Sequence, residues 1–290
     1  MSFCDASNWH VVDFSYYAVP QTRVRCIYTQ NFDLPPPDAR QTTLASCGFK
    51  GVVGSVYDIR AKSAGRALQE PATTVFSGGR PYLIYDDGTR RKLSPDQAAR
   101  LQGFPTPITQ HRDIAPPYML RRMVDDAVPP PVARRLVGAA LGVVKPADLV
   151  VDLFCGGGGF GVGARMAGAK NILAVDRLPR RLQLYRRLTG ADSDPNVAVT
   201  TVCADLLLPS TWAMLHGHVQ QKLSAGGRLH VHASPPCVSV SMANPKRKER
   251  QPEGLQFLEH VAAFMACYPD ATASAEQAPR LLVTFNDFFR

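Results

Sequence analysis

Short apolar runs alternate with helical patterns throughout the second half of the chain. Apolar runs at 148–154, 171–175, 197–203, 228–233 and 271–275 have the length and composition of buried strands. Between and after them, residues 160–168, 179–189, 210–224 and 254–267 have the periodicity of helices. This alternation is typical of a doubly wound, mostly parallel sheet that helices cover on both faces. We therefore predict an α/β fold for this half.

The first half has a different pattern. Residues 9–29 contain two β-rich stretches, and residues 30–90 are loop-rich, with PPP, GG and DDG turns. Two helices are predicted after them. Ser94 can cap the run SPDQAARLQ, with Pro95 at its first helical position. Prolines also begin a helix predicted over 129–142, where a missing N–H costs least.

Composition narrows the class of protein. The 290 residues are 45% hydrophobic, without a long apolar run and without a signal-peptide pattern, so we expect an intracellular protein with no membrane segment. Seven cysteines without a CxxC spacing suit a reducing compartment, and the histidines of HGH and HVH lack further ligands, so we expect no metal site. The formal charge of +9 favours an acidic partner, nucleic acid above all.

A glycine-rich loop joins the first predicted strand of this half to a helix, in VVDLFCGGGGFGVGARMAG. Gly156, Gly158 and Gly161 satisfy a GxGxxG spacing, and Asp176 ends the next strand. Such a loop turns helix N–H groups toward an anion and places a carboxylate on ribose hydroxyls. The pattern predicts an adenosine cofactor, either NAD or S-adenosylmethionine; the alternative is a turn that only packs strand against helix. Asp205 is either an adenine ligand or a helix cap.

A cysteine follows two prolines in HVHASPPCVSVS, at the end of the fourth predicted strand of this half. Open α/β sheets bind ligands at this edge, so Cys237 is a candidate nucleophile beside the cofactor. The alternative is a buried cysteine that acts as a small hydrophobe. The cations that follow lie on a predicted loop. They either contact DNA or RNA phosphates or form a run of charges in solvent, and they are Lys246, Arg247, Lys248 and Arg250. The five arginines of 177–187 are expected on a solvated helix face.

Taken together, the motifs resemble those of the DNA cytosine-5 methyltransferases. FCGGGGFG, AVD at 174–176, SPPCVSVS and AEQAP at 275–279 resemble the first half of that family's pattern. YAVPQTRVRCIYT at 17–29, RKLSPDQAARLQGFP at 91–105 and DDAVPPPVARRLVGAAL at 125–141 resemble its second half, but they come first. The chain thus resembles a circularly permuted member, cut between AEQAP and YAVPQTR and rejoined through LGVVKPADLV.

The resemblance implies a Rossmann-like fold of the S-adenosylmethionine-dependent methyltransferases, a mostly parallel sheet with an antiparallel hairpin at its edge. The implied fold is divided into four parts. Residues 1–29 would be the permuted end of the catalytic sheet, and residues 30–90 a short target-recognition region. Residues 91–145 would complete the catalytic domain, and residues 146–290 would form the cofactor-binding and catalytic core.

The resemblance also implies a reaction, the transfer of a methyl group from S-adenosylmethionine to cytosine C5. The substrate would be double-stranded DNA, whose target base is flipped out of the stack. Cys237 would attack cytosine C6, Glu276 would bind at N3, and Arg25 would contact O2 with Arg23 in support. The implied cofactor positions are Phe154, Gly156, Gly158, Gly159, Asp176, Asp205, Pro236 and Leu255, with Asp126, Ala127 and Val128 in the place of the family's NAV.

Three positions depart from the family pattern. Val238 replaces a glutamine, Gln277 replaces the asparagine of ENV, and Asp125 replaces a glycine whose position can require positive φ. Residues 30–70 leave little room for a base-reading module, so we expect relaxed or short-site specificity. Two alternatives share most of these motifs: an RNA cytosine-5 methyltransferase and a catalytically silent nucleic-acid-binding relative. A dehydrogenase explains only the glycine loop and Asp176.

Overall fold

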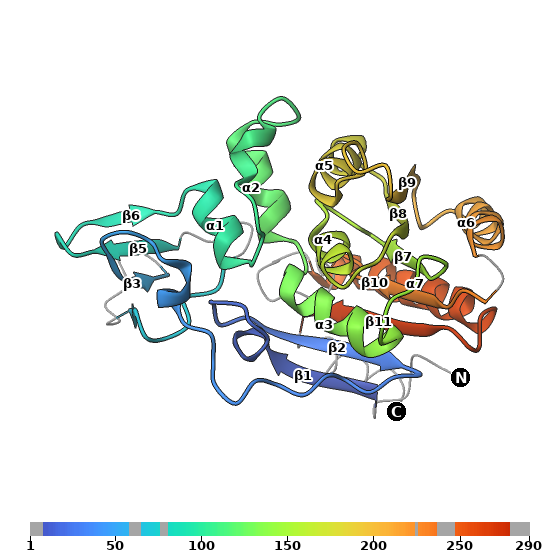
Figure 1. Ribbon diagram of the computed structural model, residues 1–290, viewed down its shortest axis with the longest axis horizontal. Coiled ribbons are helices and arrows are strands. Elements are labelled where there is room, and N and C mark those ends of the chain that lie inside the picture. The colour runs from blue at the N-terminus through green and yellow to red at the C-terminus, as the bar shows by residue number, and fades with distance from the viewer. Residues whose placement is uncertain (1–7, 58–64, 76–80, 224–225, 237–246, 279–290) are drawn as a thin grey trace.

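The computed structural model describes residues 8–57, 65–75, 81–223, 226–236 and 247–278, without the side chains of 247–255 and 258. The chain forms two sheets (Figure 1). The larger has seven strands in the order β1-β2-β11-β10-β7-β8-β9. Their bounds are Trp9–Asp13 for β1, Val24–Gln30 for β2, Leu149–Leu153 for β7, Asn171–Asp176 for β8, Ala198–Cys203 for β9, Leu229–Ala233 for β10 and Thr272–Gln277 for β11.

The larger sheet is parallel except at one edge. β11, β10, β7, β8 and β9 run parallel, whereas β1 and β2 form an antiparallel hairpin that pairs with β11 through β2. Every residue of β7 and β10 is buried, as in the central strands of a sheet covered on both faces. The predicted strands and the edge hairpin are confirmed, and the fold is the doubly wound, Rossmann-like α/β type.

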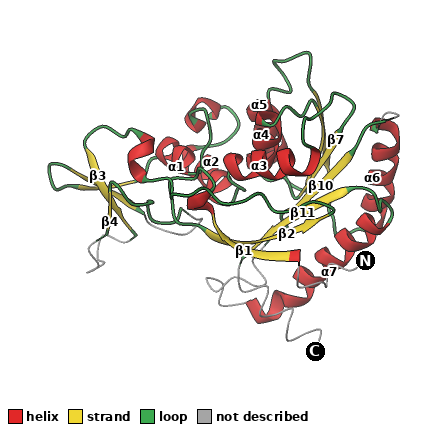
Figure 2. Cartoon of the chain, turned by 60° about the horizontal axis from the view of Figure 1, so that its bottom comes forward, coloured by secondary structure: helices red, strands yellow, loops and turns green. Residues whose placement is uncertain are grey.

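Helices cover both faces of the larger sheet (Figure 2). The helices on one face are α3 (Pro130–Leu141), α4 (Gly159–Met166) and α5 (Pro179–Thr189), and on the other α6 (Pro209–Lys222) and α7 (Arg247–Ala266). Side chains alternate between the two cores along each strand, so Val150 faces α3 and α4 while Val151 faces α6 and α7. The helix predicted over 129–142 is confirmed, and it leads into β7.

The start of α7 corrects one prediction. The helix begins at Arg247, not near residue 254, so Arg247, Lys248 and Arg250 stand in its first turn and not on a loop. The run KRKERQ consists of good helix formers, whose propensity extends the helix toward the N-terminus.

The small sheet was not predicted from the sequence. Strands β3 (Val52–Val56), β4 (Arg66–Ala67), β5 (Tyr82–Tyr85) and β6 (Arg90–Lys92) form an antiparallel sheet in the order β4-β3-β5-β6. Val52 and Leu83 pack in a core of their own together with Leu101 of α1 (Pro95–Leu101). The loop-rich interpretation of residues 30–90 was therefore wrong in part, because strands of two to five residues leave too short a pattern to detect.

Two helices lie between the sheets (Figure 1). α1 begins with the predicted cap: Ser94 Oγ accepts the Gln97 N–H at 3.1 Å, and Gln97 Oε1 accepts the Ser94 N–H at 2.9 Å. α2 (Pro117–Asp125) was not predicted, and it ends at the DDAV segment.

Candidate active site

The carboxyl ends of the parallel strands bring the predicted motifs to one edge of the larger sheet. The glycine loop follows β7, Asp176 ends β8, the SPP segment at 234–236 follows β10, and Glu276 lies near the end of β11. Ser234 N–H donates to the Leu153 carbonyl at 3.3 Å and joins the SPP segment to the strand before the glycine loop. Open α/β sheets bind their ligands at this edge.

Arg25 and Glu276 lie side by side although they stand near opposite ends of the sequence. Arg25 Nε is 3.0 Å from Glu276 Oε1, and the two side chains are 21% and 13% exposed. The contact is a charge pair without the alignment of a hydrogen bond. Glu276 stands opposite Ile27 in the β2–β11 ladder, so its side chain shares a face with Arg25. Two predicted catalytic groups thus meet, and their partial exposure leaves them accessible to a substrate.

Arg23 is held inside the protein on the same strand segment. It is only 3% exposed, and its Nη1 donates to the carbonyls of Val75 at 2.8 Å and Asp125 at 3.3 Å. A guanidinium in this position supports the strand that carries Arg25 and does not itself face solvent.

Cys237 lies outside the described residues, as do Val238 and Lys246. The chain before it is fixed by Gln277, whose Nε2 donates to the Pro235 carbonyl and whose side chain is 3% exposed. The sequence analysis treated Gln277 only as a departure from the family pattern, whereas the structure places its amide on the turn that leads to Cys237. Leu255 lies within α7, and its side chain is outside the described residues.

The glycine loop has an unusual backbone. φ is positive at Phe154 (59°), Gly156 (53°) and Gly158 (99°). Positive φ is rare for a bulky residue and is found where the surroundings impose it, often at ligand sites. The Phe154 ring meets the edge of Phe257 from α7 with centroids 4.9 Å apart. Phe257 thus joins α7 to the glycine loop, a contact that the sequence pattern did not indicate.

The glycines of this loop face different surroundings. A Cβ atom placed on Gly156 would have the Phe154 carbonyl oxygen as its nearest neighbour, 3.9 Å away. The space beside Gly156 is therefore open. A Cβ at Gly158 would lie 3.2 Å from Tyr185 Cα, and one at Gly159 would lie 2.1 Å from the Val128 carbonyl oxygen. Gly158 and Gly159 therefore permit close packing of protein on protein, and any contact they make with a cofactor is through the backbone.

The DDAV segment packs directly on this loop. The Cβ position of Gly159 is 2.8 Å from Ala127 Cβ, and both Ala127 and Val128 are buried. Asp126, in contrast, is exposed at the end of α2. The structure thus brings Ala127 and Val128 to the predicted cofactor loop.

Asp176 is tied to the glycine loop. It is 5% exposed; its Oδ2 accepts the Gly156 N–H at 3.1 Å and lies 3.4 Å from Arg181 Nη1, and its Oδ1 accepts the Leu178 N–H at 2.9 Å. These contacts hold the carboxylate at the edge where open α/β sheets bind their ligands.

Asp205 stabilises the turn before α6 and does not cap that helix, whose N-cap residue is Leu208. Its Oδ1 accepts the Leu207 N–H at 3.0 Å, which closes a turn just before α6. The side chain is partly buried after the end of β9, and its visible function is to stabilise this turn.

Asp125 does not require a glycine's backbone. It is the last residue of α2, and the non-glycine residues with positive φ in the described part of the chain are Ala18, Asn31 and Phe154. Its carboxylate is buried and lies 3.3 Å from Arg121 Nε. Burial raises the pKa of Asp125, and the Arg121 guanidinium opposes that shift.

Buried titratable groups lie beneath the site in the centre of the sheet. Burial raises the pKa of Asp152 to about 8, although Tyr185 Oη donates to its Oδ2 at 3.1 Å. Burial also lowers the pKa of His230 to about 3 and that of His232 well below its ordinary value. Ser274 Oγ bonds both imidazoles, at 3.2 and 2.9 Å. These groups are neutral at neutral pH and belong to the core.

The buried cysteines are poor nucleophiles. Burial raises the pKa of Cys26 to about 11, that of Cys47 to about 12 and that of Cys155 well above its ordinary value. Because the thiolate is the reactive form, these three thiols are inert at neutral pH. In the part of the chain that the structure describes, no cluster of three His, Cys, Asp or Glu side chains is placed to bind a metal ion.

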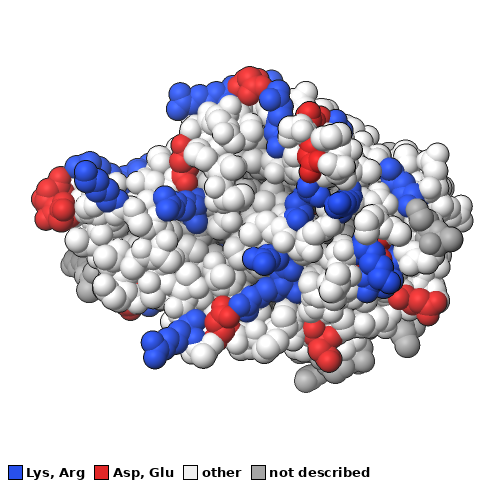
Figure 3. Space-filling view, viewed as in Figure 1, with Lys and Arg blue, Asp and Glu red and all other residues white. Residues whose placement is uncertain are grey.

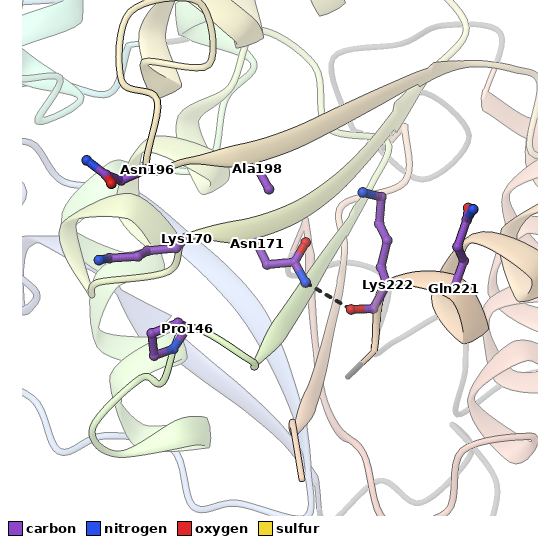
Figure 4. A pocket seen from close by; sticks show the side chains of 7 residues that line it. All are labelled: Pro146, Lys170, Asn171, Asn196, Ala198, Gln221 and Lys222. Atoms are coloured by element: carbon purple, nitrogen blue, oxygen red, sulfur yellow. Dashed lines mark hydrogen bonds between the residues drawn. The ribbon is translucent and has the colours of Figure 1, made fainter. Parts of the chain in front are cut away.

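A surface hollow of about 520 Å³ lies at the opposite edge of the sheet, at the amino ends of β8 and β9. Figure 4 shows Lys170 and Asn171 at the start of β8, with Asn171 Nδ2 bonded to the Lys222 carbonyl at the end of α6. None of the residues that line it is a predicted site residue. The hollow is therefore separate from the candidate active site.

Positive charge is distributed over the surface in several groups. Figure 3 shows Lys and Arg side chains interspersed with Asp and Glu on one face. β6 exposes Arg90, Arg91 and Lys92. The arginines of α5 lie on its exposed or partly exposed side, as predicted, and Arg187 lies 3.3 Å from Asp113. Among the helices of the described residues, none is both long and apolar enough to cross a membrane.

Comparison with known proteins gives a partial match. No family model matches the chain. A type II methyltransferase, M.DdeI from Desulfomicrobium norvegicum, is 30% identical over 112 residues, which cover 39% of this chain and 23% of that protein. The match thus spans about a quarter of the length of the curated relative.

Two solved structures are distantly similar. The bifunctional kinase-methyltransferase WbdD aligns with 40% of this chain and 22% of its own, at 18% identity and a TM-score of 0.26. A SAM-dependent methyltransferase from Anabaena variabilis aligns with 41% of each chain, at 13% identity and a TM-score of 0.24. Because both TM-scores are low, these two structures do not establish the fold. We assign the fold from the order and direction of the strands in the larger sheet.

Proposed function

We propose that the protein transfers a methyl group from S-adenosylmethionine to C5 of cytosine in double-stranded DNA. The observation that carries this proposal is the Arg25–Glu276 pair, 3.0 Å apart and partly exposed at the edge where the glycine loop and the SPP segment end. A cation and a carboxylate in this position suit the O2 and N3 edge of a pyrimidine. The partial match to a type II methyltransferase supports the same class of reaction.

The proposal includes a circular permutation. β2 pairs with β11, so the N-terminal hairpin completes a sheet whose other strands come from the second half of the chain. Trp9 of β1 pairs with Tyr28 of β2, which pairs with Ala275 of β11. The first and last strands of the described chain are thus two strand spacings apart, roughly 10 Å. A cut and a rejoining at these positions preserve the sheet.

The residues at the carboxyl edge fit S-adenosylmethionine. Open space beside Gly156 admits a ligand to the backbone, and the Asp176 carboxylate is fixed beside it by the Gly156 N–H. Phe154, with its imposed backbone conformation, offers a ring at the same edge. The cofactor supplies an electrophilic methyl group on a sulfonium. Ala127 and Val128 pack against Gly159 and close the other side of the loop.

The protein's own residues activate the base. Cytosine C5 is a weak nucleophile, and addition of the Cys237 thiolate to C6 moves electron density to C5. As negative charge develops on the ring, Glu276 delivers a proton to N3 and accepts a hydrogen bond from the exocyclic amine, and Arg25 stabilises O2; the N3 proton returns to Glu276 when the thiolate leaves. Once C5 has accepted the methyl group, loss of its proton and elimination of the thiolate regenerate Cys237. The base is extruded from the helix first, because C6 is inaccessible in a stacked duplex.

The small sheet is the proposed target-recognition region. Arg90, Arg91 and Lys92 project from β6 and suit phosphate contacts, which position DNA without reading its sequence. The sheet has four strands of at most five residues, so it offers few side chains to base edges. We therefore propose a short or relaxed target site. Bisulfite sequencing of treated DNA is the test, and methylation confined to one long motif is the result that contradicts it.

The direct test is a methyl-transfer assay. Purified protein is incubated with labelled S-adenosylmethionine and cytosine-rich duplex DNA, or the same sequence as RNA, beside a Cys237→Ser variant. We expect label in 5-methylcytosine from DNA with the wild type and none with the variant. Label in RNA alone would replace DNA by RNA as substrate, and no label in either polymer would favour the catalytically silent relative.

A further inference from the structure

The backbone around Phe154 is anchored on both sides of this residue. Before it, the Leu153 carbonyl accepts the Ser234 N–H at 3.3 Å, and after it, the Cys155 N–H donates to the Val175 carbonyl at 2.9 Å. Phe154 itself has a φ of 59°, in the left-handed region that a bulky side chain seldom occupies. Such a conformation persists where the surrounding contacts impose it.

Phe257 of α7 supplies one of these contacts, through the side chain. Its ring and that of Phe154 are 4.9 Å apart between centroids and meet at 82°, edge to face. Both side chains are partly buried, and both pack against the core that lies between the larger sheet and α6 and α7. Because an edge-to-face pair is attractive beyond the apolar area that it buries, the contact favours one direction of the Phe154 ring.

The position of Phe257 is set by α7 and not by the glycine loop. Val261 and Phe264 follow it by about one and two helical turns and are 1% and 2% exposed in the same core. The Phe264 ring also packs on Trp212 of α6, with centroids 5.4 Å apart. These contacts seat α7 on the sheet without Phe154. Phe257 is therefore a fixed support for the Phe154 ring.

Phe154 stands two residues before the open part of the glycine loop. The space beside Gly156 is free, and the Gly156 N–H donates to Asp176 Oδ2 at 3.1 Å. An aromatic ring can pack on the face of a nucleobase, and a fixed carboxylate can accept the hydroxyls of its ribose. The direction of the Phe154 ring thus bears on how an adenosine is bound at this edge.

Resting on the proposed function, we propose that Phe257 is a positioning residue for S-adenosylmethionine. It holds the Phe154 ring in the direction that lets this ring pack on the adenine, and it thereby connects α7 to the glycine loop. Without the Phe257 ring, the Phe154 ring can turn into the vacated space. The loss then falls on cofactor affinity, because Phe257 does not act on the base that is methylated.

The test compares Phe257→Leu with Phe257→Tyr. Leucine removes the ring and retains much of the apolar volume, whereas tyrosine retains the ring. We expect the dissociation constant of S-adenosylmethionine, from calorimetry, to rise about tenfold or more with leucine and to stay within about threefold with tyrosine. At saturating cofactor, kcat should stay within about threefold of the wild type in both variants, so that the loss appears in KM.

Phe264→Leu is the matched control, with the same substitution two turns further along α7. It removes a ring that packs on Trp212 and lies deeper in the core than Phe257, so it should lower the midpoint of thermal unfolding more than Phe257→Leu does. At a temperature at which both variants are folded, Phe264→Leu should leave the dissociation constant of S-adenosylmethionine within about twofold of the wild type.

Hydrogen–deuterium exchange follows the glycine loop without cofactor. Exchange of a peptide that contains residues 153–158 should rise severalfold in Phe257→Leu, while a peptide from β8 keeps the wild-type rate. In Phe257→Tyr and Phe264→Leu both peptides should exchange as in the wild type. This measurement does not depend on methyl transfer.

The inference and the proposed function fail in different ways. If the wild type binds no S-adenosylmethionine, the proposed function fails, and the exchange of residues 153–158 still shows whether Phe257 holds the loop. Wild-type cofactor affinity or wild-type exchange of the loop in Phe257→Leu would overturn the inference. An equal loss of affinity in Phe257→Tyr or in Phe264→Leu would do the same, since neither variant removes the ring that contacts Phe154.

Discussion

Neighbouring glycines in one loop respond to different constraints. Gly156 has positive φ and open space beside it, whereas Gly159 lies against the backbone of Val128. The spacing of glycines in the sequence indicates a cofactor loop, but it does not distinguish a glycine that admits a ligand from one that admits another segment of protein. That distinction depends on the packing of α4 against α3 and the DDAV segment.

This distinction predicts opposite profiles for two alanine variants. Gly159→Ala should lower the free energy of unfolding by about 1–3 kcal/mol, because a backbone oxygen stands where its Cβ must go. Gly156→Ala should cost about 1–2 kcal/mol for its positive φ and should also weaken S-adenosylmethionine binding. Thermal unfolding and calorimetry measure the two effects. Equal loss of cofactor affinity in both variants, after correction for the folded fraction, would contradict this division.

Glu276 and Arg25 are expected to act on the base and not on the cofactor. Glu276→Gln preserves the size of the side chain and removes its proton-transfer capacity, so kcat should fall by roughly 100-fold or more. Arg25→Lys should also lower kcat, because ammonium does not reproduce the geometry of the guanidinium. Both variants should bind S-adenosylmethionine with wild-type affinity in calorimetry. A loss of cofactor affinity equal to the loss of kcat would place the pair in the cofactor site instead.

The central strands β10 and β11 share a polar core that makes stability depend on pH. His230 and His232 are neutral in the folded protein, whereas the unfolded chain binds protons at both below about pH 6.5. The unfolded state then holds more protons, so the free energy of unfolding falls as pH falls. Each histidine contributes up to about 1.4 kcal/mol per pH unit. Asp152, whose folded pKa is raised, has the opposite slope between about pH 4 and pH 8.

His232→Gln isolates the histidine contribution. The stability difference between wild type and variant, from denaturant unfolding at pH 5.0, 6.0 and 7.0, should move in favour of the variant as pH falls. Asp152 contributes the same pH dependence to the free energy of unfolding of both proteins, so its contribution cancels in the difference. A difference that is constant over this range would mean that His232 keeps an ordinary pKa in the folded protein.

The elements that the sequence predicted are those with long and continuous patterns. The central strands β7 and β10 are buried on both faces, and the start of α1 is marked in the sequence by the capping box at Ser94. The small sheet was missed because its strands are short, and β6 is a run of three cations, Arg90 to Lys92. α2 was missed because it has only nine residues and follows a proline-rich loop, which leaves a helical pattern of little more than two turns.

At the scale of the whole molecule, the order of the elements along the chain differs from their order in the sheet. The position of the N-terminal hairpin beside β11 followed from the motif resemblance and not from periodicity. Contacts between distant segments, such as Gln277 with Pro235 or Arg121 with the Leu93 carbonyl, could be predicted from neither the resemblance nor the periodicity. They depend on tertiary geometry that no local pattern encodes.

The permutation predicts that the chain tolerates a second rearrangement. A variant that starts at residue 146, continues to 290 and then, through a flexible Gly/Ser linker, runs from residue 1 to 145 restores the usual motif order. Because β1, β2 and β11 are adjacent in the sheet, we expect it to fold with a similar circular dichroism spectrum and to retain methyl transfer. An insoluble or unfolded product, with several linker lengths, would contradict the proposed permutation.

The central claim is that Cys237, Glu276 and Arg25 act on one pyrimidine ring. Incubation with S-adenosylmethionine and duplex DNA that carries 5-fluorocytosine tests it most directly, because fluorine replaces the C5 hydrogen that must leave as a proton before the thiolate is eliminated, so the adduct is trapped. We predict a denaturation-resistant complex whose peptide map places the DNA on Cys237, formed far more slowly by Glu276→Gln. A methylated product without a trapped complex, or an adduct on another cysteine, would contradict the account.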